Sequence, residues 1–412
     1  MIRILDGDCR DVLKTLPDES VHCVVTSPPY WGLRDYGTEP QVWGGDPDCA
    51  HDWDGFVRAG MSGGPSDKQD SNAGSKVKQQ QQQQQQCKKC AAWMGNFGLE
   101  PTPQMYVEHT VQIFREARRV LRDDGTLWLN LGDSYTGSGK GGNPEEGKQA
   151  TNKGSQTIGV LYGKTAETAR EAALTNVSRR WTTEAGMAPK NLVGIPWRVA
   201  FALQADGWYL RQDIIWAKPN PMPESVIDRC TKAHEYIFML SKRARYYYDQ
   251  DAIKIPATLS TVERLSQPGL EDQEGSYRVP GKTNGPMKAV GKVDRQRGHS
   301  RRHAGFNDRW DAMEKAEQCS GMVNKRSVWT VATQPFSEAH FATFPPKLIE
   351  PCILAGCPTG GTVLDPFGGA GTTGLVADRL QRDAILIELN QEYAAMARRR
   401  ISGDAPLFAE VA

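Results

Sequence analysis

The chain has 412 residues, of which 39% are hydrophobic, and this is enough for one large core with inserted segments. Its formal net charge of +1 excludes a uniformly basic protein, so any contact with nucleic acid has to come from a local cluster. No apolar run approaches the ~18 residues of a membrane span, and the opening MIRILDGDCRD has no basic leader before an apolar stretch. We therefore expect a cytoplasmic protein with reduced cysteines and no membrane partner.

The first 36 residues predict the beginning of an α/β core. Residues 2–5 and the apolar run 21–25 indicate short strands, and residues 11–16 between them favour a helix. The second strand leads directly into Thr26-Ser27-Pro28-Pro29-Tyr30-Trp31. Neither proline can donate to a sheet ladder, so we expect this strand to stop at a rigid turn that faces solvent.

The proline turn presents three groups at fixed positions, namely the Ser27 hydroxyl, the Pro28 carbonyl and the Tyr30 ring. Two hydrogen-bond acceptors beside an aromatic face suit a planar base that carries an exocyclic amine. Acceptors outside the ring plane would draw the amine hydrogens aside and aim the nitrogen lone pair at an electrophile. The simpler alternative is a strand-end turn in which Ser27 is only a local cap.

Residues 37–98 lose their periodicity and predict an insertion that is flexible in part, with eight consecutive glutamines at 79–86. The insertion contains a C-x-H motif at 49–51 and a C-x-x-C motif at 87–90, the usual spacing of a zinc knuckle. Together they predict a closed, structural zinc site, with ordinary free thiols as the alternative. The predicted ligands are Cys49, His51, Cys87 and Cys90.

Residues 99–254 are expected to continue the core, with a flexible loop at 137–190. The pattern predicts a helix that starts at Thr102-Pro103 and ends before Gly125, a strand at 126–131, a helix at 195–206, and strands at 209–216, 236–240 and 245–248. Alternating strands and helices are typical of an α/β fold with a mostly parallel sheet.

Residues 255–335 are irregular and contain a basic stretch. Between 282 and 309, eight Lys or Arg residues stand against two acids. A basic stretch is often only a solvated surface, but in a protein that modifies bases it favours contact with phosphates. We predict DNA contacts from Lys292, Arg295, Arg297, Arg301 and Arg302.

Residues 336–412 contain the second motif. An apolar strand at 362–364 is followed by Asp365-Pro366-Phe367 and the glycine-rich run 368–374, whose glycines let the backbone approach a ligand. The next strand, 384–387, ends in Glu388. An acid at the tip of the second strand is placed to accept hydrogen bonds from the ribose hydroxyls of an adenosine cofactor.

Residues 369–374 also satisfy G-x-G-x-x-G, so a dinucleotide oxidoreductase is the natural rival, and an α/β core without a nucleotide is the simplest alternative. The Asp-Pro-Phe insertion favours S-adenosylmethionine, because a carboxylate there can hold the aminoacyl end of the cofactor. An oxidoreductase would also leave the proline turn without a function.

The two motifs together resemble the signatures of DNA amino-methyltransferases, which methylate the exocyclic nitrogen of cytosine or adenine. The catalytic motif precedes the cofactor motif, an order similar to the circularly permuted beta group. The resemblance covers residues 1–36, 99–251 and 336–401. It implies a Rossmann-like, circularly permuted fold with a mostly parallel seven-stranded sheet, in which 336–412 bind the cofactor and 255–335 recognise the DNA target.

The resemblance also implies roles for individual residues. Ser27, Pro28, Pro29 and Tyr30 would handle the target base. The cofactor would contact Asp8, Phe341, Thr343, Asp365, Pro366, Phe367, Gly369, Gly371, Thr372 and Glu388. Within this set, residues 341–345 look like the segment that closes over the methionine moiety, and Asp8 stands where an acid approaches the adenine.

Members with serine in the first catalytic position are mostly cytosine-N4 enzymes, so Ser27 favours cytosine over adenine. Adenine N6 stays open as the alternative, because a hydroxyl accepts the amine hydrogen of either base. Double-stranded DNA is the implied substrate, and a cognate restriction endonuclease is a candidate partner. A non-catalytic DNA-binding protein on the same scaffold is the alternative from another class. The recognised DNA sequence and the oligomeric state are left open.

Overall fold

The computed structural model describes residues 1–33, 36–53, 85–136, 187–188, 190–258, 322–334 and 343–404. The chain divides into a large unit, 1–248 with 327–412, and a small unit, 249–326. The small unit has one turn of 3-10 helix, η1 (Asp251–Ile253), and an antiparallel pair of β9 (Ile255–Pro256) with β10 (Met322–Val323). Within the described ranges, no helix is long and apolar enough to cross a membrane.

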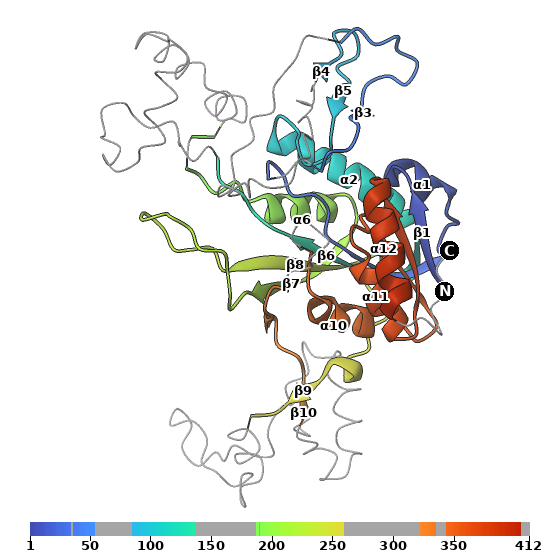
Figure 1. Ribbon diagram of the computed structural model, residues 1–412, viewed down its shortest axis with the longest axis vertical. Coiled ribbons are helices and arrows are strands. Elements are labelled where there is room, and N and C mark those ends of the chain that lie inside the picture. The colour runs from blue at the N-terminus through green and yellow to red at the C-terminus, as the bar shows by residue number, and fades with distance from the viewer. Residues whose placement is uncertain are drawn as a thin grey trace, which may run out of the picture. The chain divides into compact units, whose positions relative to one another are not determined.

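An eight-stranded sheet forms the centre of the large unit (Figure 1). In spatial order its strands are β1 (Ile2–Asp6), β13 (Asp383–Glu388), β12 (Thr362–Asp365), β2 (Val21–Thr26), β6 (Leu121–Leu131), β8 (His234–Ser241), β7 (Tyr209–Ala217) and β11 (Val328–Thr330). Neighbours run parallel except at β8, which is antiparallel to both β6 and β7. The predicted mostly parallel α/β sheet is confirmed, with the short β11 added to the expected seven strands.

The strand order shows the circular permutation. Counted from β12, the path continues to β13 and then, across the two ends of the chain, to β1, β2 and β6, which gives the spatial order 3-2-1-4-5. This is the beginning of the order in a Rossmann-type doubly wound sheet. The expected Rossmann-like, permuted fold is therefore confirmed, and one half of the sheet combines the last strands of the chain with the first.

Two layers of helices cover the sheet (Figure 1). One layer contains α1 (Cys9–Thr15), α2 (Pro103–Val120) and α6 (Ile195–Ala205), and the other contains α10 (Pro346–Gly356), α11 (Thr372–Arg379) and α12 (Gln391–Asp404). The start of α2 follows the predicted cap, because the Thr102 hydroxyl accepts a hydrogen bond from the Met105 amide at 3.2 Å. Its apolar stripe, with Tyr106 and Phe114, is fully buried against the sheet.

Two predictions from the sequence were wrong, namely the start of β6 and a strand at 245–248. The strand begins at Leu121 instead of 126, and its pairing with β2 shifts register after Val21, so that an irregularity absorbs the polar residues 122–125. Residues 245–248 are not a strand. The Tyr248 ring stacks on Trp128 with centroids 6.4 Å apart, so this segment covers the sheet without extending it.

The described ends of the insertion form a small antiparallel sheet of β3 (Gln41–Trp43), β5 (Trp93–Gly95) and β4 (Gln85–Gln86). Trp43 stacks on His109 of α2 and on Phe97, with centroid distances of 4.5 and 5.4 Å. The buried Glu100 accepts from the Gly98 amide at 2.9 Å and pairs with His109 at 3.0 Å. These contacts fix the insertion to the helix layer.

Candidate active site

The two motifs predicted from the sequence meet at one edge of the sheet. Strands β2 and β12 are parallel neighbours, and the path of the chain turns in opposite directions on either side of them. Such a switch point opens a crevice at the carboxyl ends of the strands, where α/β proteins bind ligands. The last residues of the two strands touch, because the Thr26 hydroxyl donates to the Asp365 carboxylate at 2.6 Å.

Asp365 is 1% exposed and takes three hydrogen bonds from the protein. Besides Thr26, the Thr373 hydroxyl donates at 2.6 Å and the Phe367 amide at 3.0 Å. Burial, only partly offset by these donors, raises the pKa of Asp365 to about 7. The side chain therefore ties the glycine turn to β2, and its direct contact with a cofactor stays a prediction.

Two backbone amides of the glycine turn donate hydrogen bonds to the end of β13. Gly368 donates to the Ile387 carbonyl at 2.8 Å, and Gly369 donates to the Glu388 carboxylate at 2.7 Å. Gly369 has a φ of 49°, and a Cβ built there would meet its nearest neighbour only at 3.9 Å, so the backbone is open on this side. At Gly371 a Cβ would lie 2.8 Å from the Cβ of Ala397, so this glycine serves the packing of α12 on the start of α11.

Glu388 stands at the end of β13, as predicted, and is partly buried. Its second carboxylate oxygen accepts from the Asn390 amide at 2.8 Å. Burial raises the pKa of Glu388 above its ordinary value, although the two amides oppose the shift. The Gly7 amide donates to its carbonyl at 2.9 Å, which brings the end of β1 beside it.

Asp8 follows Gly7 and caps α1 by accepting from the Arg10 amide at 2.9 Å. The Arg10 guanidinium pairs with the Asp8 carboxylate at 2.5 Å and lies 3.8 Å above the centre of the Trp43 ring. This ion pair was not predicted from the sequence. It means that Asp8 is held at the site edge together with a cation.

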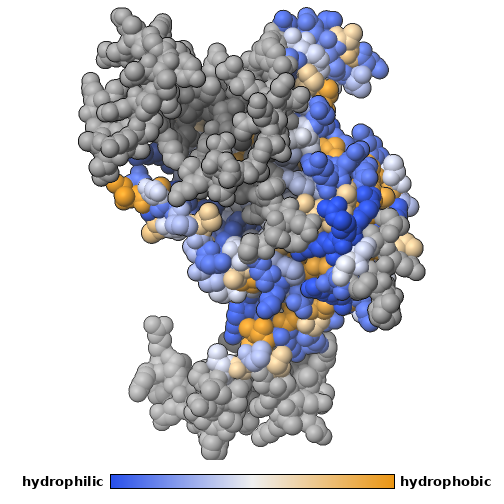
Figure 2. Space-filling model, in the orientation of Figure 1, coloured by the Kyte–Doolittle hydropathy of each residue, from blue (hydrophilic) through white to orange (hydrophobic). Residues whose placement is uncertain are grey.

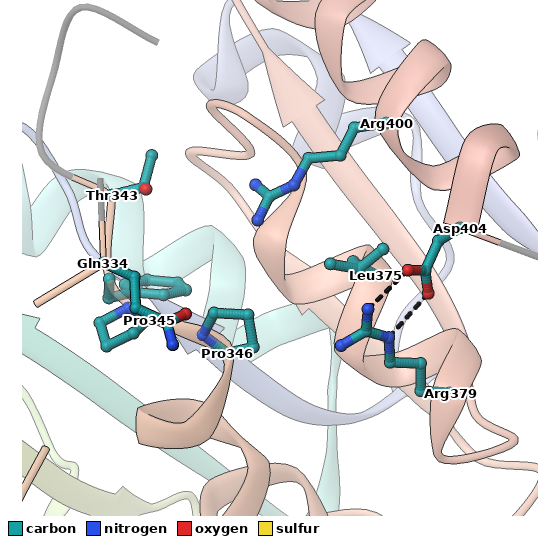
Figure 3. A pocket seen from close by; sticks show the side chains of 9 residues that line it. Gln334, Thr343, Pro345, Pro346, Leu375, Arg379, Arg400 and Asp404 are labelled. Carbon is teal, nitrogen blue, oxygen red and sulfur yellow. Dashed lines mark hydrogen bonds and ion pairs between the residues drawn. The ribbon is translucent and has the colours of Figure 1, made fainter. Parts of the chain in front are cut away.

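The remaining predicted cofactor residues lie in or near the glycine turn, except for Phe341. Pro366 is buried, and the Phe367 ring stacks on Phe97 with centroids 5.6 Å apart. The Thr372 hydroxyl accepts from Arg400 at 2.9 Å. Thr343 lines a cavity of about 310 Å³ with residues of α11 and α12, and the Arg400 side chain points toward it (Figure 3). Phe341 lies outside the described residues.

The proline turn is anchored on α2. The strand β2 ends at Thr26, as predicted, and Pro28 is buried. The hydroxyl of the buried Tyr106 donates to the Pro29 carbonyl at 2.8 Å, and the Trp31 indole donates to the Glu100 carbonyl at 2.9 Å. The turn is therefore fixed by one side chain of α2 and by a backbone carbonyl just before this helix, and the Ser27 end faces the crevice.

Ser27 and Tyr30 share a polar cluster with Asn130 of β6 and Glu235 of β8. The Ser27 hydroxyl lies 3.3 Å from the Tyr30 hydroxyl and 3.4 Å from the Asn130 side-chain oxygen. Tyr30 donates to the Glu235 carboxylate at 2.7 Å. Burial and the charge of Glu235 raise the pKa of Tyr30 well above its ordinary value, so the phenol stays protonated.

The far side of this cluster is an ion pair that the sequence did not predict. Lys218, at the end of β7, pairs with Glu235, and both side chains are largely shielded from solvent. The Lys218 ammonium also lies 4.2 Å from the centre of the Trp216 ring. Asn130 is a polar residue inside an apolar strand, and this could have indicated the cluster from the sequence. Lys218 and Glu235 lie at strand ends, and no motif around them marks them as partners.

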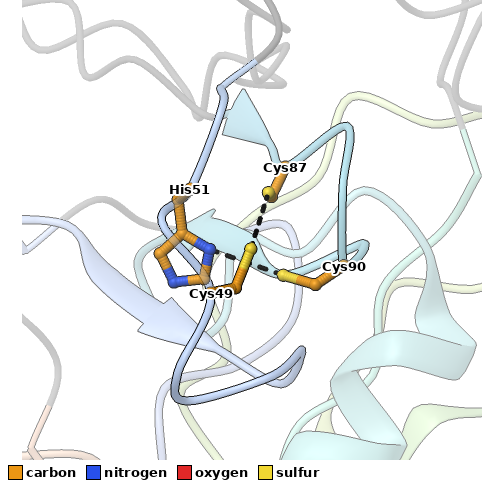
Figure 4. A group of neighbouring side chains, drawn as sticks. All are labelled: Cys49, His51, Cys87 and Cys90. Atoms are coloured by element: carbon orange, nitrogen blue, oxygen red, sulfur yellow. Dashed lines mark hydrogen bonds between the residues drawn. The ribbon is translucent and has the colours of Figure 1, made fainter.

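The four predicted zinc ligands converge in the structure (Figure 4). Their ligand atoms lie within 4.8 Å of one another, with 4.0 Å between the Cys49 and Cys87 sulfurs and 3.4 Å between the Cys90 sulfur and His51 Nδ1. Tetrahedral zinc, with bonds of about 2.0–2.3 Å, would place such atoms about 3.5–3.8 Å apart. The donor set therefore fits a closed zinc site.

The backbone around the cluster also suits a metal. The Lys89 amide points to the Cys87 sulfur at 3.4 Å, as in a zinc knuckle. Burial opposes ionisation of Cys87, but backbone amides outweigh it and lower the pKa of this thiol to about 6. Gly45 passes so close that a Cβ there would lie 2.8 Å from the Cys90 sulfur.

The predicted DNA contacts Lys292, Arg295, Arg297, Arg301 and Arg302 lie outside the described residues, as does most of the loop 137–190.

Comparison with known proteins agrees with this geometry. Residues 21–399 match the N6/N4 family described as DNA methylase. The chain is 37% identical over 399 residues to the Type II methyltransferase M.SmaI of Serratia marcescens, covering 97% of this chain and 90% of that protein. It is 35% identical over 401 residues to M.Cfr9I of Citrobacter freundii, covering 97% and 88%. A solved structure of the cytosine-N4-specific PvuII DNA methyltransferase is more distant, with a TM-score of 0.49 and 15% identity over 97% of this chain and 86% of that one. The chain thus belongs to the N6/N4 DNA methylase family and is a DNA methyltransferase.

Proposed function

We propose that the enzyme transfers a methyl group from S-adenosylmethionine to the N4 amine of cytosine in double-stranded DNA. The observation that carries this proposal is the contact of Thr26 with Asp365, because it joins the base-handling turn to the glycine turn. Neighbouring strands lie about 4.8 Å apart, so ligands held at the two turns are neighbours as well. A methyl donor and an amine held there need little further movement to react.

The glycine turn supports S-adenosylmethionine over a dinucleotide. In a dinucleotide site the amides of such a turn approach the pyrophosphate. Here the amides of Gly368, Gly369 and Gly371 are all bonded within the protein. The open side of Gly369 and the carboxylate of Glu388 fit the uncharged sugar of an adenosine. When bound, S-adenosylmethionine supplies an electrophilic methyl group.

Ser27 is the residue that we expect to activate the amine. Its hydroxyl can donate to the Asn130 oxygen at 3.4 Å, and this leaves its own oxygen free to accept an amine hydrogen. The Pro28 carbonyl would accept the second hydrogen, and the Tyr30 ring would stack on the base. Drawing both hydrogens aside exposes the nitrogen lone pair without a covalent enzyme adduct. A hydroxyl would serve either base, so the preference for cytosine rests on the resemblance of Ser27 to the serine of cytosine-N4 enzymes, and adenine N6 is the alternative.

The target base has to leave the duplex to reach this turn, because its exocyclic amine is inaccessible inside the stack. We propose that the basic residues between 292 and 302 hold the DNA phosphates and that 255–335 recognise the target. Their effect would appear as a salt-dependent affinity, with each phosphate contact contributing about one unit to the slope. A cognate restriction endonuclease is the partner that we propose for the cell.

We also propose one structural zinc ion held by Cys49, His51, Cys87 and Cys90. The support is that the four ligand atoms converge within 4.8 Å of one another and are of the kinds that zinc prefers. The cluster joins the two described ends of the insertion, so the metal would stabilise that segment. Four protein ligands leave no position for water, and none of the transfer chemistry needs the ion.

The test is nucleoside mass spectrometry of DNA treated with the enzyme and S-adenosylmethionine. N4-methylcytosine is the expected product, and N6-methyladenine would select the alternative. Formation of 5-methylcytosine, or of a trapped covalent adduct, would contradict both. Ser27→Ala should slow transfer by roughly 10- to 100-fold, since a lost hydrogen bond to the reacting group is worth ~1–3 kcal/mol, while Ser20→Ala at an exposed turn should match the wild type.

A further inference from the structure

The loop between β7 and β8 leaves the sheet at the edge where methyl transfer is proposed. Strand β8 is antiparallel to β6 and β7 is antiparallel to β8, so residues 218–233 lie at the same edge as the proline turn. The root of the loop is part of the active-site cluster, because Lys218 pairs with Glu235 behind Tyr30. From this root the loop projects away from the sheet (Figure 1).

The loop is held in shape by charged side chains. Glu224 pairs with Arg229 at 2.6 Å and accepts from the Lys232 amide at 3.3 Å, which closes a short turn. The Arg229 guanidinium lies 4.0 Å above the Tyr135 ring, and the Lys232 ammonium donates to the Asp133 carbonyl at 2.8 Å. The Glu224–Arg229 ion pair and the contacts of Arg229 and Lys232 hold the base of the turn, so its tip has a defined position.

The tip of this turn carries exposed apolar side chains next to the acidic Asp228. Ile227, between Glu224 and Arg229, is 101% exposed, and Met222 just before the turn is 72% exposed. Hydrophobic residues gather at this projecting end of the molecule (Figure 2). Large apolar side chains usually leave water when a neighbouring surface is available. An anchored turn that keeps two of them exposed is suited to burying them in a partner.

We propose that this loop inserts Ile227, supported by Met222, into the DNA stack beside the target base. The inference rests on the proposed displacement of that base into the Tyr30 turn. Apolar side chains, Ile and Met among them, are used by DNA-binding proteins as wedges that unstack a base step. Residues 218–233 carry three basic side chains, Lys218, Arg229 and Lys232, against the two acids Glu224 and Asp228, and this small positive excess suits an anionic partner such as DNA.

In this arrangement, Ile227 and the proline turn have separate roles at the target base. Ile227 fills the space that the base leaves, and the proline turn receives the base itself. Removing the wedge would leave the chemistry intact and would raise the cost of opening the duplex. A substrate whose target base is already unpaired would therefore not need Ile227.

The test compares Ile227→Ala and the Met222→Ala, Ile227→Ala double variant with the wild type in the full-length enzyme. The matched control is Phe201→Ala, which removes a 55% exposed apolar side chain from α6. The first substrate is a paired, unmethylated duplex that contains the site on which the enzyme acts. The second is the same duplex with an abasic position opposite the target base. We expect kcat/KM on the paired duplex to fall on the order of 10-fold, since unstacking costs a few kcal/mol, and to be restored on the abasic duplex.

Equal losses on both duplexes, or no loss on either, would overturn the proposal. Fluorescence of 2-aminopurine at the target position tests displacement of the base separately from insertion of the wedge. If the wild type gives no increase on binding, base displacement itself fails and the wedge with it. If the wild type and the double variant give the same increase, only the wedge fails. If the double variant instead dissociates a wild-type dimer in sedimentation, the tip is a contact between copies of this chain and the proposal is wrong.

Discussion

The hydroxyl of Tyr30 donates to the carboxylate of Glu235 at 2.7 Å, across 205 positions of the chain. Glu235 is balanced by Lys218, so the acceptor is an ion pair that is itself largely buried. The Tyr30 ring also packs closely against Gly132, where a Cβ would lie 2.4 Å from a ring carbon. The ring that should stack on the target base is thus fixed by its hydroxyl and by close packing.

Tyr30→Phe keeps the stacking ring but removes its anchor. We expect kcat to fall about 10-fold with little change in cofactor affinity, since hydrogen bonds to charged groups contribute about 1.5–3 kcal/mol. Glu235→Gln should have a similar effect, and the double variant should be no slower than the worse single variant. Strictly additive losses would show that the two residues act independently. Tyr246→Phe, whose hydroxyl lies by Arg211, is the control and should leave kcat unchanged.

Glu388→Ala should weaken S-adenosylmethionine binding, because the carboxylate holds the Gly369 amide and faces the expected ribose. A lost charge-assisted hydrogen bond of ~1–3 kcal/mol corresponds to roughly 10- to 100-fold in the dissociation constant. Isothermal calorimetry measures this directly, with Glu392→Ala on the exposed side of α12 as the control. Unchanged affinity, or tighter binding of a nicotinamide dinucleotide, would remove Glu388 from the cofactor site.

The purified enzyme should contain one zinc ion per chain, and the Cys87→Ser, Cys90→Ser double variant should lose it. Elemental analysis of protein prepared without chelators provides the measurement, and Cys230→Ser, at an exposed thiol, should keep the metal. Hydrogen exchange should accelerate first in residues 37–53 of the double variant, with transfer activity affected later. A wild-type preparation without metal would return the four residues to ordinary thiols and imidazole.

The buried Asp365 makes stability depend on pH in a defined direction. Its pKa rises from 3.8 to about 7 on folding, so the folded state favours the protonated acid. The contribution to stability is therefore complete below about pH 4 and is lost as the pH rises toward 7. Asp365→Asn, which keeps an acceptor for the Phe367 amide, should gain a few degrees in melting temperature relative to wild type between pH 5 and pH 8. A constant difference across this range would contradict the shift.

The parts of the fold that could be predicted are those with a strong local signal. The proline turn, the glycine turn and Glu388 each stand at the end of an apolar strand, and all three lie where the sequence placed them. The order of the motifs also sufficed for the permutation. Strong periodicity and turn chemistry fix these features within a few neighbouring residues, so no tertiary information was needed.

The parts that were missed depend on distant contacts. Strand β11 has three residues, and its central Trp329 lies beside Trp216 only because β7 supplies the edge. The strands of the insertion are equally short and are stabilised by stacking on α2. Lys218 and Glu235 pair across the β7–β8 loop, and nothing in the sequence near either residue indicates the other. Short elements and cross-strand ion pairs are set by the assembled sheet, not by propensity.

The permuted strand order also determines when, during synthesis, the cofactor-binding part of the sheet can form. Strand β1 is at the edge of the sheet, and its one neighbour is β13, to which residues 2–6 pair through 384–388. During synthesis the first strand therefore has no partner until residues 384–388 have left the ribosome. Pairings of such long sequence separation form late and slowly. A chain that ends before β13 lacks the strand that carries Glu388, so we expect it to lack the proposed cofactor site and to be inactive.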